Sequence, residues 1–114
     1  MEGQKKLVFA VVHGIVQGVM FRQTFLHACY KRGIAGGATN HPDDIHRVDL
    51  SMAGDASKIQ EILDKMASGD KLNSNLARVE KLEIVEDGLL PYEHEANTKS
   101  VKCDNEIPGI NFYL

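Results

Sequence analysis

The sequence of 114 residues predicts an α+β fold in which two helices lie on one face of an antiparallel sheet. Three observations predict it. Two segments carry apolar residues at helical spacing, four carry the alternating or continuous apolar pattern of strands, and their order along the chain is βαββαβ. Two right-handed crossovers turn that order into a split βαβ sandwich, to which a short C-terminal strand is expected to add.

The first unit of the chain is a strand, a loop with two glycines and a helix. Residues 7–12 are apolar on both faces, as in a central strand that is covered on both sides. Apolar residues then recur at helical spacing at Phe21, Phe25, Ala28 and Cys29. Gly33 is well placed to end this helix in a left-handed conformation, and residues 1–6 are expected to form an N-terminal tail.

The middle of the chain predicts a hairpin followed by the second helix. Residues 34–39 form a weak strand and residues 48–53 a stronger one with a single apolar face, and turn-forming residues lie between them. Asp55 or Ser57 can cap the helix that follows. Its apolar stripe consists of Ile59, Ile62, Leu63 and Met66. Gly69 is expected to end it.

The C-terminal part is less regular. Residues 77–86 predict a fourth strand, in which Val79 falls out of phase with the other apolar residues and indicates a bulge. Residues 88–108 have no stable period and are expected to form an extended loop. Residues 110–114 alternate again, as in a short edge strand. Because the length suits one core, residues 1–114 are expected to form a single domain.

Composition and charge exclude several classes of function. The net charge of −3 provides no positive field to attract nucleic acid or an anionic membrane. An RNA-binding sandwich would need aromatic residues on its sheet, and residues 48–53 contain none. Cys29 and Cys103 are too few for a disulfide scaffold, and the N-terminal apolar run, which is broken at His13, is too short to span a bilayer. We expect a soluble, cytoplasmic monomer with free thiols.

The loop after the first strand has the properties of an anion-binding site. The stretch HGIVQGVMFR, residues 13–22, places two glycines before a helix, where they allow backbone N–H groups to converge. Neither Val19 nor Met20 can cap the helix with a side-chain oxygen, so its first N–H groups are left for a ligand. Arg22 adds a planar set of donors that suits a phosphoryl group. A structural turn with a surface arginine remains the alternative, because glycine loops are weak motifs.

Within this stretch, GIVQGVMFR resembles the signature G-x-V-Q-G-V-x-F-R of the acylphosphatases at every fixed position, and RGIAGGATN is similar to a family run that ends in asparagine. The resemblance covers roughly residues 7–86. It implies a ferredoxin-like fold and hydrolysis of small acyl phosphates, with no metal or other cofactor. It also implies that Arg22 and the loop bind the phosphoryl group, while Asn40 positions the attacking water. The binding loop then comprises Gly14, Ile15, Val16, Gln17, Gly18, Val19 and Met20.

Three departures from the family pattern bear on rate and substrate preference. Gly37, Ala38 and Thr39 stand where the family often has an aromatic residue and a valine, which weakens the strand before the asparagine. The turn after Asn40 is longer than in the family and lacks the family's glycine. The segment of residues 88–108 is also longer than is typical of the family. The alternative function is therefore a catalytically inactive member of the family that binds phosphate or a partner.

Other polar groups have simpler interpretations. One run could hold a metal ion: His41, Asp43, Asp44 and His46. A solvated hairpin is the more usual meaning of such a run. His13 could lie beside the bound anion or be a hydrogen-bonded residue at the end of a strand. Cys29 is expected to be an inert core thiol, and His94 and Cys103 have no ligand spacing around them.

Overall fold

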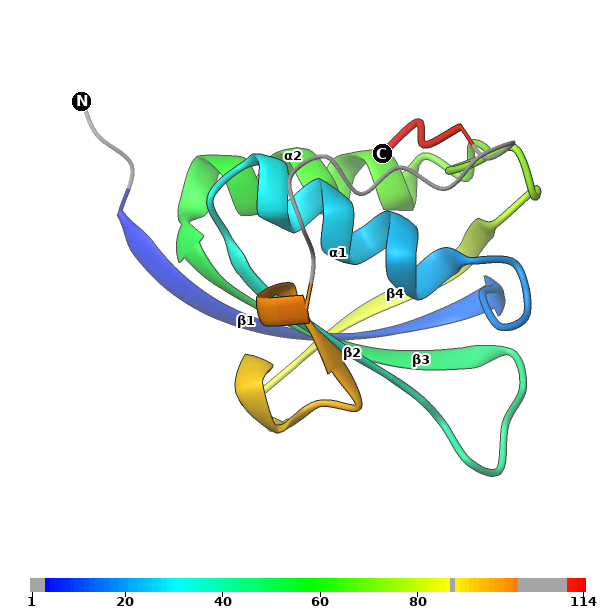
Figure 1. The fold of residues 1–114 in the computed structure, drawn as a ribbon, viewed down its shortest axis with the longest axis horizontal. Helices are drawn as coiled ribbons and strands as arrows, with labels where there is room; N and C mark the ends of the chain where they lie inside the picture. The colour runs from blue at the N-terminus through cyan, green and yellow to red at the C-terminus, as the bar shows by residue number, and fades with distance from the viewer. Residues whose placement is uncertain (1–3, 87, 101–110) are drawn as a thin grey trace.

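The computed structural model describes residues 4–86, 88–100 and 111–114. Its elements follow the predicted βαββαβ order, with a fifth strand after them (Figure 1). Their bounds are β1 Lys5–Ile15, α1 Phe21–Lys31, β2 Ala35–Asn40, β3 Arg47–Asp55, α2 Ala56–Ala67, β4 Arg78–Val85 and β5 Ala96–Asn97. Two short 3₁₀ segments flank β5, with η1 at Pro91–Glu93 and η2 at Thr98–Ser100.

The strands form one sheet in the order β4-β1-β3-β2-β5, and each paired strand is antiparallel. Figure 1 shows both helices on one face of this sheet, which confirms the predicted ferredoxin-like sandwich. β1 pairs with β3 from Lys5 to His13, so Lys5 and Lys6 belong to the sheet and not to a tail of residues 1–6. Both lysines are exposed, and the apolar pattern that located the strand could not include them.

A bulge between β1 and β4 sets the start of the loop. The register shifts after His13, where Gly14 pairs with Val79 and leaves Glu80 as the extra residue. This shift confirms the bulge that the phase of Val79 predicts. Gly14 has a φ of +148°, and a Cβ there would lie 2.4 Å from a backbone carbonyl oxygen of β4. Glycine is required at this point of the ladder.

The core lies between the sheet and the helical layer. Its largest fully buried side chains include Phe21, Phe25, Leu26, Ile59, Ile62 and Met66 from the helical layer and Val12, Val48 and Met52 from the strands. Asp55 is the residue that caps α2, because its Oδ1 accepts hydrogen bonds from the N–H groups of Ser57 and Lys58 at 2.8 and 3.4 Å. The hydroxyl and N–H of Ser57 lower the pKa of this carboxyl. After α1, Gly33 has a φ of +71°, the predicted left-handed conformation.

The fifth strand is not the predicted segment at residues 110–114. β5 lies inside the predicted loop of residues 88–108 and pairs with the middle of β2. Near the C-terminus, Phe112 forms an isolated bridge to Asn73. A strand of two residues is too short to show a period, so pairing with β2 sets its place and its own pattern does not. Residues 101–108 of the predicted loop lie outside the described residues.

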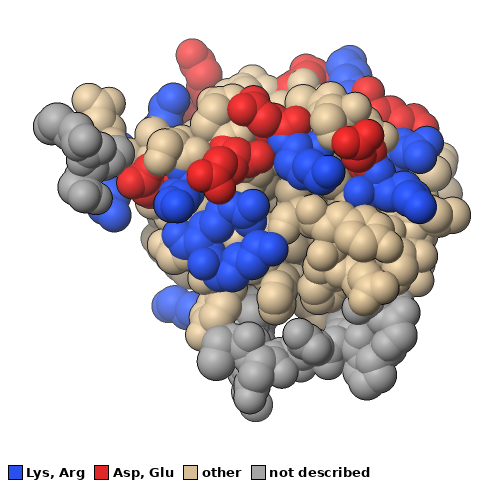
Figure 2. Space-filling view, turned by 90° about the horizontal axis from the view of Figure 1, so that it is seen from above, with Lys and Arg blue, Asp and Glu red and all other residues tan. Residues whose placement is uncertain are grey.

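The surface carries charges of both signs. Figure 2 looks onto the helical layer and shows Lys and Arg side chains interspersed with Asp and Glu. Two ion pairs on this side join Arg32 to Glu61 and Lys65 to Asp70. Among the described residues, no helix has the length and apolar character needed to cross a membrane.

Candidate active site

The loop between β1 and α1 bends through two left-handed residues. Gly18 has a φ of +77°, and Met20, which immediately precedes α1, has a φ of +62°. Met20 makes no side-chain hydrogen bond to the helix start, as the sequence predicts. Within the described part of the chain, the N–H groups of Gly18, Val19 and Met20 have no backbone or side-chain acceptor. The loop thus presents donors beside the positive end of a helix, an arrangement that binds anions.

Two amide side chains hold the loop in this shape. Gln17 Nε2 donates to three backbone carbonyl oxygens of the β2–β3 hairpin, at 2.8, 3.0 and 3.3 Å. Asn73 is fully buried, and its Nδ2 donates to the carbonyl oxygen of Val19 at 2.8 Å. Asn73 lies in a stretch with the composition of a polar linker, so nothing in the sequence indicated that it supports the loop.

Arg22 and Asn40 meet the loop at one cavity of about 240 Å³. The rest of its lining consists of Val16, Gly18, Met20, Phe21 and Gln23. Arg22 comes from the first turn of α1, and Asn40 is the last residue of β2. The Oδ1 atom of Asn40 is buried and has no hydrogen-bond partner among the described residues. Such an acceptor can take a hydrogen bond from a water molecule while the loop donors hold an anion.

The other predicted loop residues have different surroundings. Gly14 and Ile15 belong to the end of β1, and the N–H of Gly14 donates to the carbonyl oxygen of His46 at 2.8 Å. Val19 packs its side chain against the hydrophobic core. Gln17 turns its amide to the hairpin. The part of the predicted loop that lines the cavity is therefore the stretch between β1 and α1.

A carboxylate that the sequence did not single out binds both Arg22 and Asn40. Glu95 lies just before β5, and its Oε1 accepts a hydrogen bond from Arg22 Nη1 at 2.5 Å. The same oxygen accepts one from the backbone N–H of Asn40 at 3.3 Å. Arg22 and Glu95 are 73 residues apart, and Glu95 stands in a segment without periodicity, so no spacing in the sequence could pair them.

Glu95 is held in turn by Thr39 and His94. The N–H of Glu95 donates to Thr39 Oγ1 at 2.9 Å, and that hydroxyl lies 2.9 Å from Nδ1 of His94. The other ring nitrogen, Nε2, lies 3.1 Å from the carbonyl oxygen of Leu89. Because a carbonyl only accepts, Nε2 carries the hydrogen, and Nδ1 of the neutral ring accepts from the hydroxyl. Burial lowers the pKa of His94 from its ordinary value of 6.5, which favours this neutral form.

The glycines of the weak strand follow from close packing on both of its faces. A Cβ on Gly36 would lie 2.7 Å from the Sγ atom of Cys29, a buried residue of α1. A Cβ on Gly37 would lie 2.5 Å from the His94 ring on the opposite face. Successive residues of a strand point to opposite faces, so both layers can approach only where side chains are missing. Gly37, one of the residues that depart from the family pattern, therefore makes room for the segment that carries His94.

The remaining polar candidates do not line this cavity. No group of three or more His, Cys, Asp or Glu side chains in the described ranges could hold a metal ion. In the hairpin, His41 and Asp44 accept hydrogen bonds from nearby backbone N–H groups, and His13 Nε2 lies 3.8 Å from an oxygen of Asp44. Cys29 is fully buried, as predicted, and burial raises the pKa of its thiol. Cys103 lies outside the described residues.

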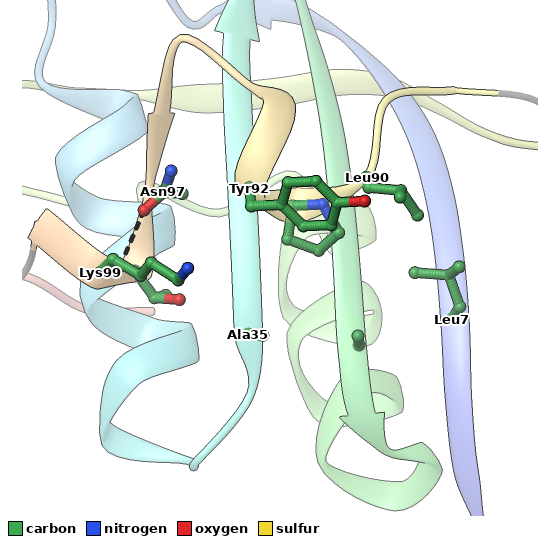
Figure 3. A pocket seen from close by; sticks show the side chains of 9 residues that line it. Leu7, Ala35, Leu90, Tyr92, Asn97 and Lys99 are labelled. Carbon is green, nitrogen blue, oxygen red and sulfur yellow. Dashed lines mark hydrogen bonds between the residues drawn. The ribbon is translucent and has the colours of Figure 1, made fainter.

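A second cavity, of about 300 Å³, lies near the opposite end of β2 (Figure 3). Its lining includes Leu7, Ala35 and Ala53 from β1, β2 and β3, Leu90, Pro91 and Tyr92 from the segment before β5, Asn97 from β5 itself, and Thr98 and Lys99 from η2. Ala35 begins β2, whereas Asn40 ends it. Among the described residues, Lys99 is the one charged residue in this lining. Arg22 and Asn40, on which the family resemblance centres, do not line this second cavity.

Comparisons with known proteins agree with the loop motif. Residues 8–96 match the family model described as Acylphosphatase. The chain belongs to the acylphosphatase family. The match reaches β5 and so includes Glu95, beyond the resemblance over residues 7–86 that the motifs indicated.

Two curated acylphosphatases illustrate the similarity. The one from Chlorobaculum tepidum is 30% identical over 81 residues, which are 70% of this chain and 86% of the relative. The one from Geobacillus thermodenitrificans is 31% identical over 90 residues, or 79% of this chain and 89% of the relative. The crystal structure of acylphosphatase from Bacillus subtilis matches with a TM-score of 0.61 and 26% identity, over 80% of this chain and 93% of that one.

Proposed function

We propose that this acylphosphatase hydrolyses small acyl phosphates to a carboxylate and inorganic phosphate. One observation carries the proposal. The N–H groups of the loop, the guanidinium of Arg22 and the buried Oδ1 of Asn40 surround one cavity at the N-terminus of α1. The family match supports the reaction class, and a cavity of about 240 Å³ suits a small substrate.

In this proposal the loop and Arg22 hold the phosphoryl group. The transferring group passes through a loose transition state, so the protein acts mainly by positioning it and by stabilising charge on its equatorial oxygens. Backbone N–H donors at a helix start and a planar guanidinium are suited to that charge. The leaving group is a carboxylate, which is stable at neutral pH and needs no acid to protonate it. Arg22 and the loop are therefore sufficient on this side of the reaction.

Asn40 positions the water. Its Oδ1 accepts one hydrogen of the water, whose oxygen is then aimed at phosphorus in line with the departing carboxylate. The bond from phosphorus to the water oxygen forms as the bond to the carboxyl oxygen breaks. A phosphoryl oxygen takes the proton, so no carboxylate or histidine base is required. The steps use no metal ion or other cofactor.

Two substitutions test the proposal with benzoyl phosphate as substrate. Arg22→Ala should lower kcat at least about 10²-fold, or about 3 kcal/mol, because it removes charge stabilisation in the transition state. Asn40→Ala should lower kcat more than it changes KM, because it removes the group that orients the water. Arg32→Ala is the matched control, since Arg32 also forms an ion pair with a glutamate but does not line the cavity.

The alternative is an inactive member of the family that binds phosphate or a partner. Wild-type protein that binds inorganic phosphate but leaves benzoyl phosphate intact would support this alternative and overturn the proposal. Loss of activity in Arg32→Ala equal to that in Arg22→Ala would contradict the assigned role of Arg22.

We also propose that residues 1–114 form a single domain that works as a cytoplasmic monomer. The near balance of charge, with 13 Lys and Arg against 16 Asp and Glu, gives no strong field to attract a charged partner, which supports this. Light scattering on the purified protein should give the mass of one chain. A dimer at assay concentrations would contradict it.

A further inference from the structure

We infer that Glu95 is a positioning residue for the proposed reaction, and that Thr39 and His94 hold it where it fixes Arg22 relative to Asn40. The inference rests on the proposed function and extends the site to His94 and Glu95, which share no motif with the loop. It concerns how the two proposed residues are aligned, and Glu95 itself does not touch the substrate.

The first argument is that one oxygen joins the two residues. Glu95 Oε1 accepts from Arg22 Nη1 at 2.5 Å and from the N–H of Asn40 at 3.3 Å. Arginine has a long, flexible side chain, and a charged hydrogen bond to a fixed acceptor removes much of that freedom. A guanidinium offers five N–H donors, and at Arg22 only Nη1 has a partner among the described residues. The remaining donors stay available for a phosphoryl group.

The second argument is that Glu95 lies beside the anion position and not in it. Glu95 does not line the cavity that Arg22 and Asn40 share with the loop. It contacts none of the N–H groups of Gly18 and its neighbours, which have no acceptor in the described ranges. A carboxylate that imitated the phosphate would bind those donors. Glu95 therefore supports Arg22 from outside the cavity and leaves the N–H donors of the loop free to bind an anion.

The third argument is that Glu95 is itself held in place. Its N–H donates to Thr39 Oγ1, and the same hydroxyl is fixed by the His94 ring, which is 8% exposed and hydrogen-bonded at both nitrogens. The ion pair with Arg22 is more open, with side-chain exposures of 34% for Arg22 and 52% for Glu95. Such an exposed pair adds little to stability. Its contribution is thus expected in the orientation of Arg22 and hardly in folding.

The test compares two disruptive variants with two matched controls in benzoyl phosphate hydrolysis. Glu95→Ala and Thr39→Val should each lower kcat about 10-fold or more, with KM little changed, because a poorly oriented Arg22 stabilises the transition state less well. Thr39→Ser keeps the hydroxyl and should restore wild-type kcat. Glu93→Ala removes the same charge from the same segment without touching Arg22 and should leave kcat unchanged. The double variant Thr39→Val/Glu95→Ala should be no worse than the more affected single variant.

A second measurement does not depend on turnover. Exchange of the Arg22 guanidinium hydrogens with water, followed by NMR in the ligand-free protein, should be faster in Glu95→Ala and Thr39→Val than in wild type and Thr39→Ser. Unchanged exchange would overturn the inference even if the wild type proves inactive. If the wild type is active, an unchanged kcat in Glu95→Ala overturns the inference and leaves the proposed function standing. A lower KM with a higher kcat would also overturn it, since a competing carboxylate gives that result.

Discussion

The two halves of the candidate site are built in different ways. The loop half is contiguous: residues 14–22 contain the glycines, the N–H donors and the arginine, and more distant groups such as Asn73 only brace this stretch. The asparagine half is assembled: Asn40 ends a glycine-containing strand, and the carboxylate that binds it comes 55 residues later. A short motif can thus place an anion, while the alignment of the groups around it depends on a distant segment.

The largest expected effect is in the loop half, at Gly14. Gly14→Ala introduces a Cβ 2.4 Å from the Arg78 carbonyl oxygen and 2.8 Å from the Glu80 nitrogen, at a φ of +148°. These contacts are with backbone atoms of β4, which cannot rotate away. The free energy of unfolding should therefore fall by about 3 kcal/mol or more. Urea unfolding would measure the change. A variant as stable as the wild type would show that the bulge does not require glycine.

The next effect is in the assembled half, at Gly37. Gly37→Ala places a Cβ 2.5 Å from the His94 ring and 2.6 Å from the Pro91 carbonyl oxygen, and should displace the segment that carries Glu95. We expect a loss of about 1–3 kcal/mol in stability together with a lower kcat. Gly36→Ala is the matched control, because its Cβ meets Cys29 Sγ at 2.7 Å on the helical face. It should reduce stability and spare kcat. Equal kcat losses in both variants would contradict a specific role for the covering segment.

A smaller effect should appear as a pH dependence of the assembled half. Burial lowers the pKa of His94 from 6.5, although a hydrogen bond to Leu89 and the charges of Asp49 and Glu93 oppose the shift. The unfolded state therefore binds the proton more readily. The stability that neutral His94 contributes is complete above pH 6.5 and is lost as the pH falls through the lower, folded-state pKa.

This dependence can be isolated with one variant. Wild type should lose more unfolding free energy than His94→Gln when urea unfolding at neutral pH is compared with unfolding well below pH 6.5. The other histidines are common to both proteins and cancel in the difference. Parallel pH profiles would mean that His94 is not held in its neutral form.

The smallest effect is expected at Gly18, in the loop half. Gly18→Ala meets no atom within 4 Å, so its cost is the left-handed conformation alone, at a φ of +77°. The free energy of unfolding should fall by about 1 kcal/mol, and activity should be retained. Two glycines of one motif would then differ clearly in stability. A loss as large as that of Gly14→Ala would show that the loop tolerates no side chain at either position.

The features predicted from the sequence are those that leave a local pattern. Periodicity located both helices and two of the longer strands, a continuous apolar run located β1, β2 was predicted only as a weak strand, and the phase of Val79 indicated the bulge. The uncapped start of α1 also followed from local composition, because Met20 has no side-chain oxygen to offer. In each case the physical cause lies within a few residues of its effect.

The features that escaped prediction depend on contacts between distant segments. β5 has two residues and no period, so only its pairing with β2 defines it. Asn73 and Glu95 stand in polar, aperiodic stretches, and their partners in the loop half are more than fifty residues away. The roles assigned to Arg22 and Asn40 came from the family resemblance, and they stay predictions until the variants are assayed.

The glutamine of the loop has a consequence for how this protein could be redesigned. Gln17 ties the loop between β1 and α1, the proposed phosphate-binding loop, to carbonyl oxygens at His41, Asp44 and Arg47, which span the whole bend after β2. If that bend were shortened to the length typical of the family, Gln17 would lose hydrogen-bond acceptors. The loop between β1 and α1 would then be held less firmly. A hairpin grafted from another protein would therefore have to supply carbonyl acceptors for Gln17. Without them, the conformation of the loop between β1 and α1 would change although the loop itself had not been mutated.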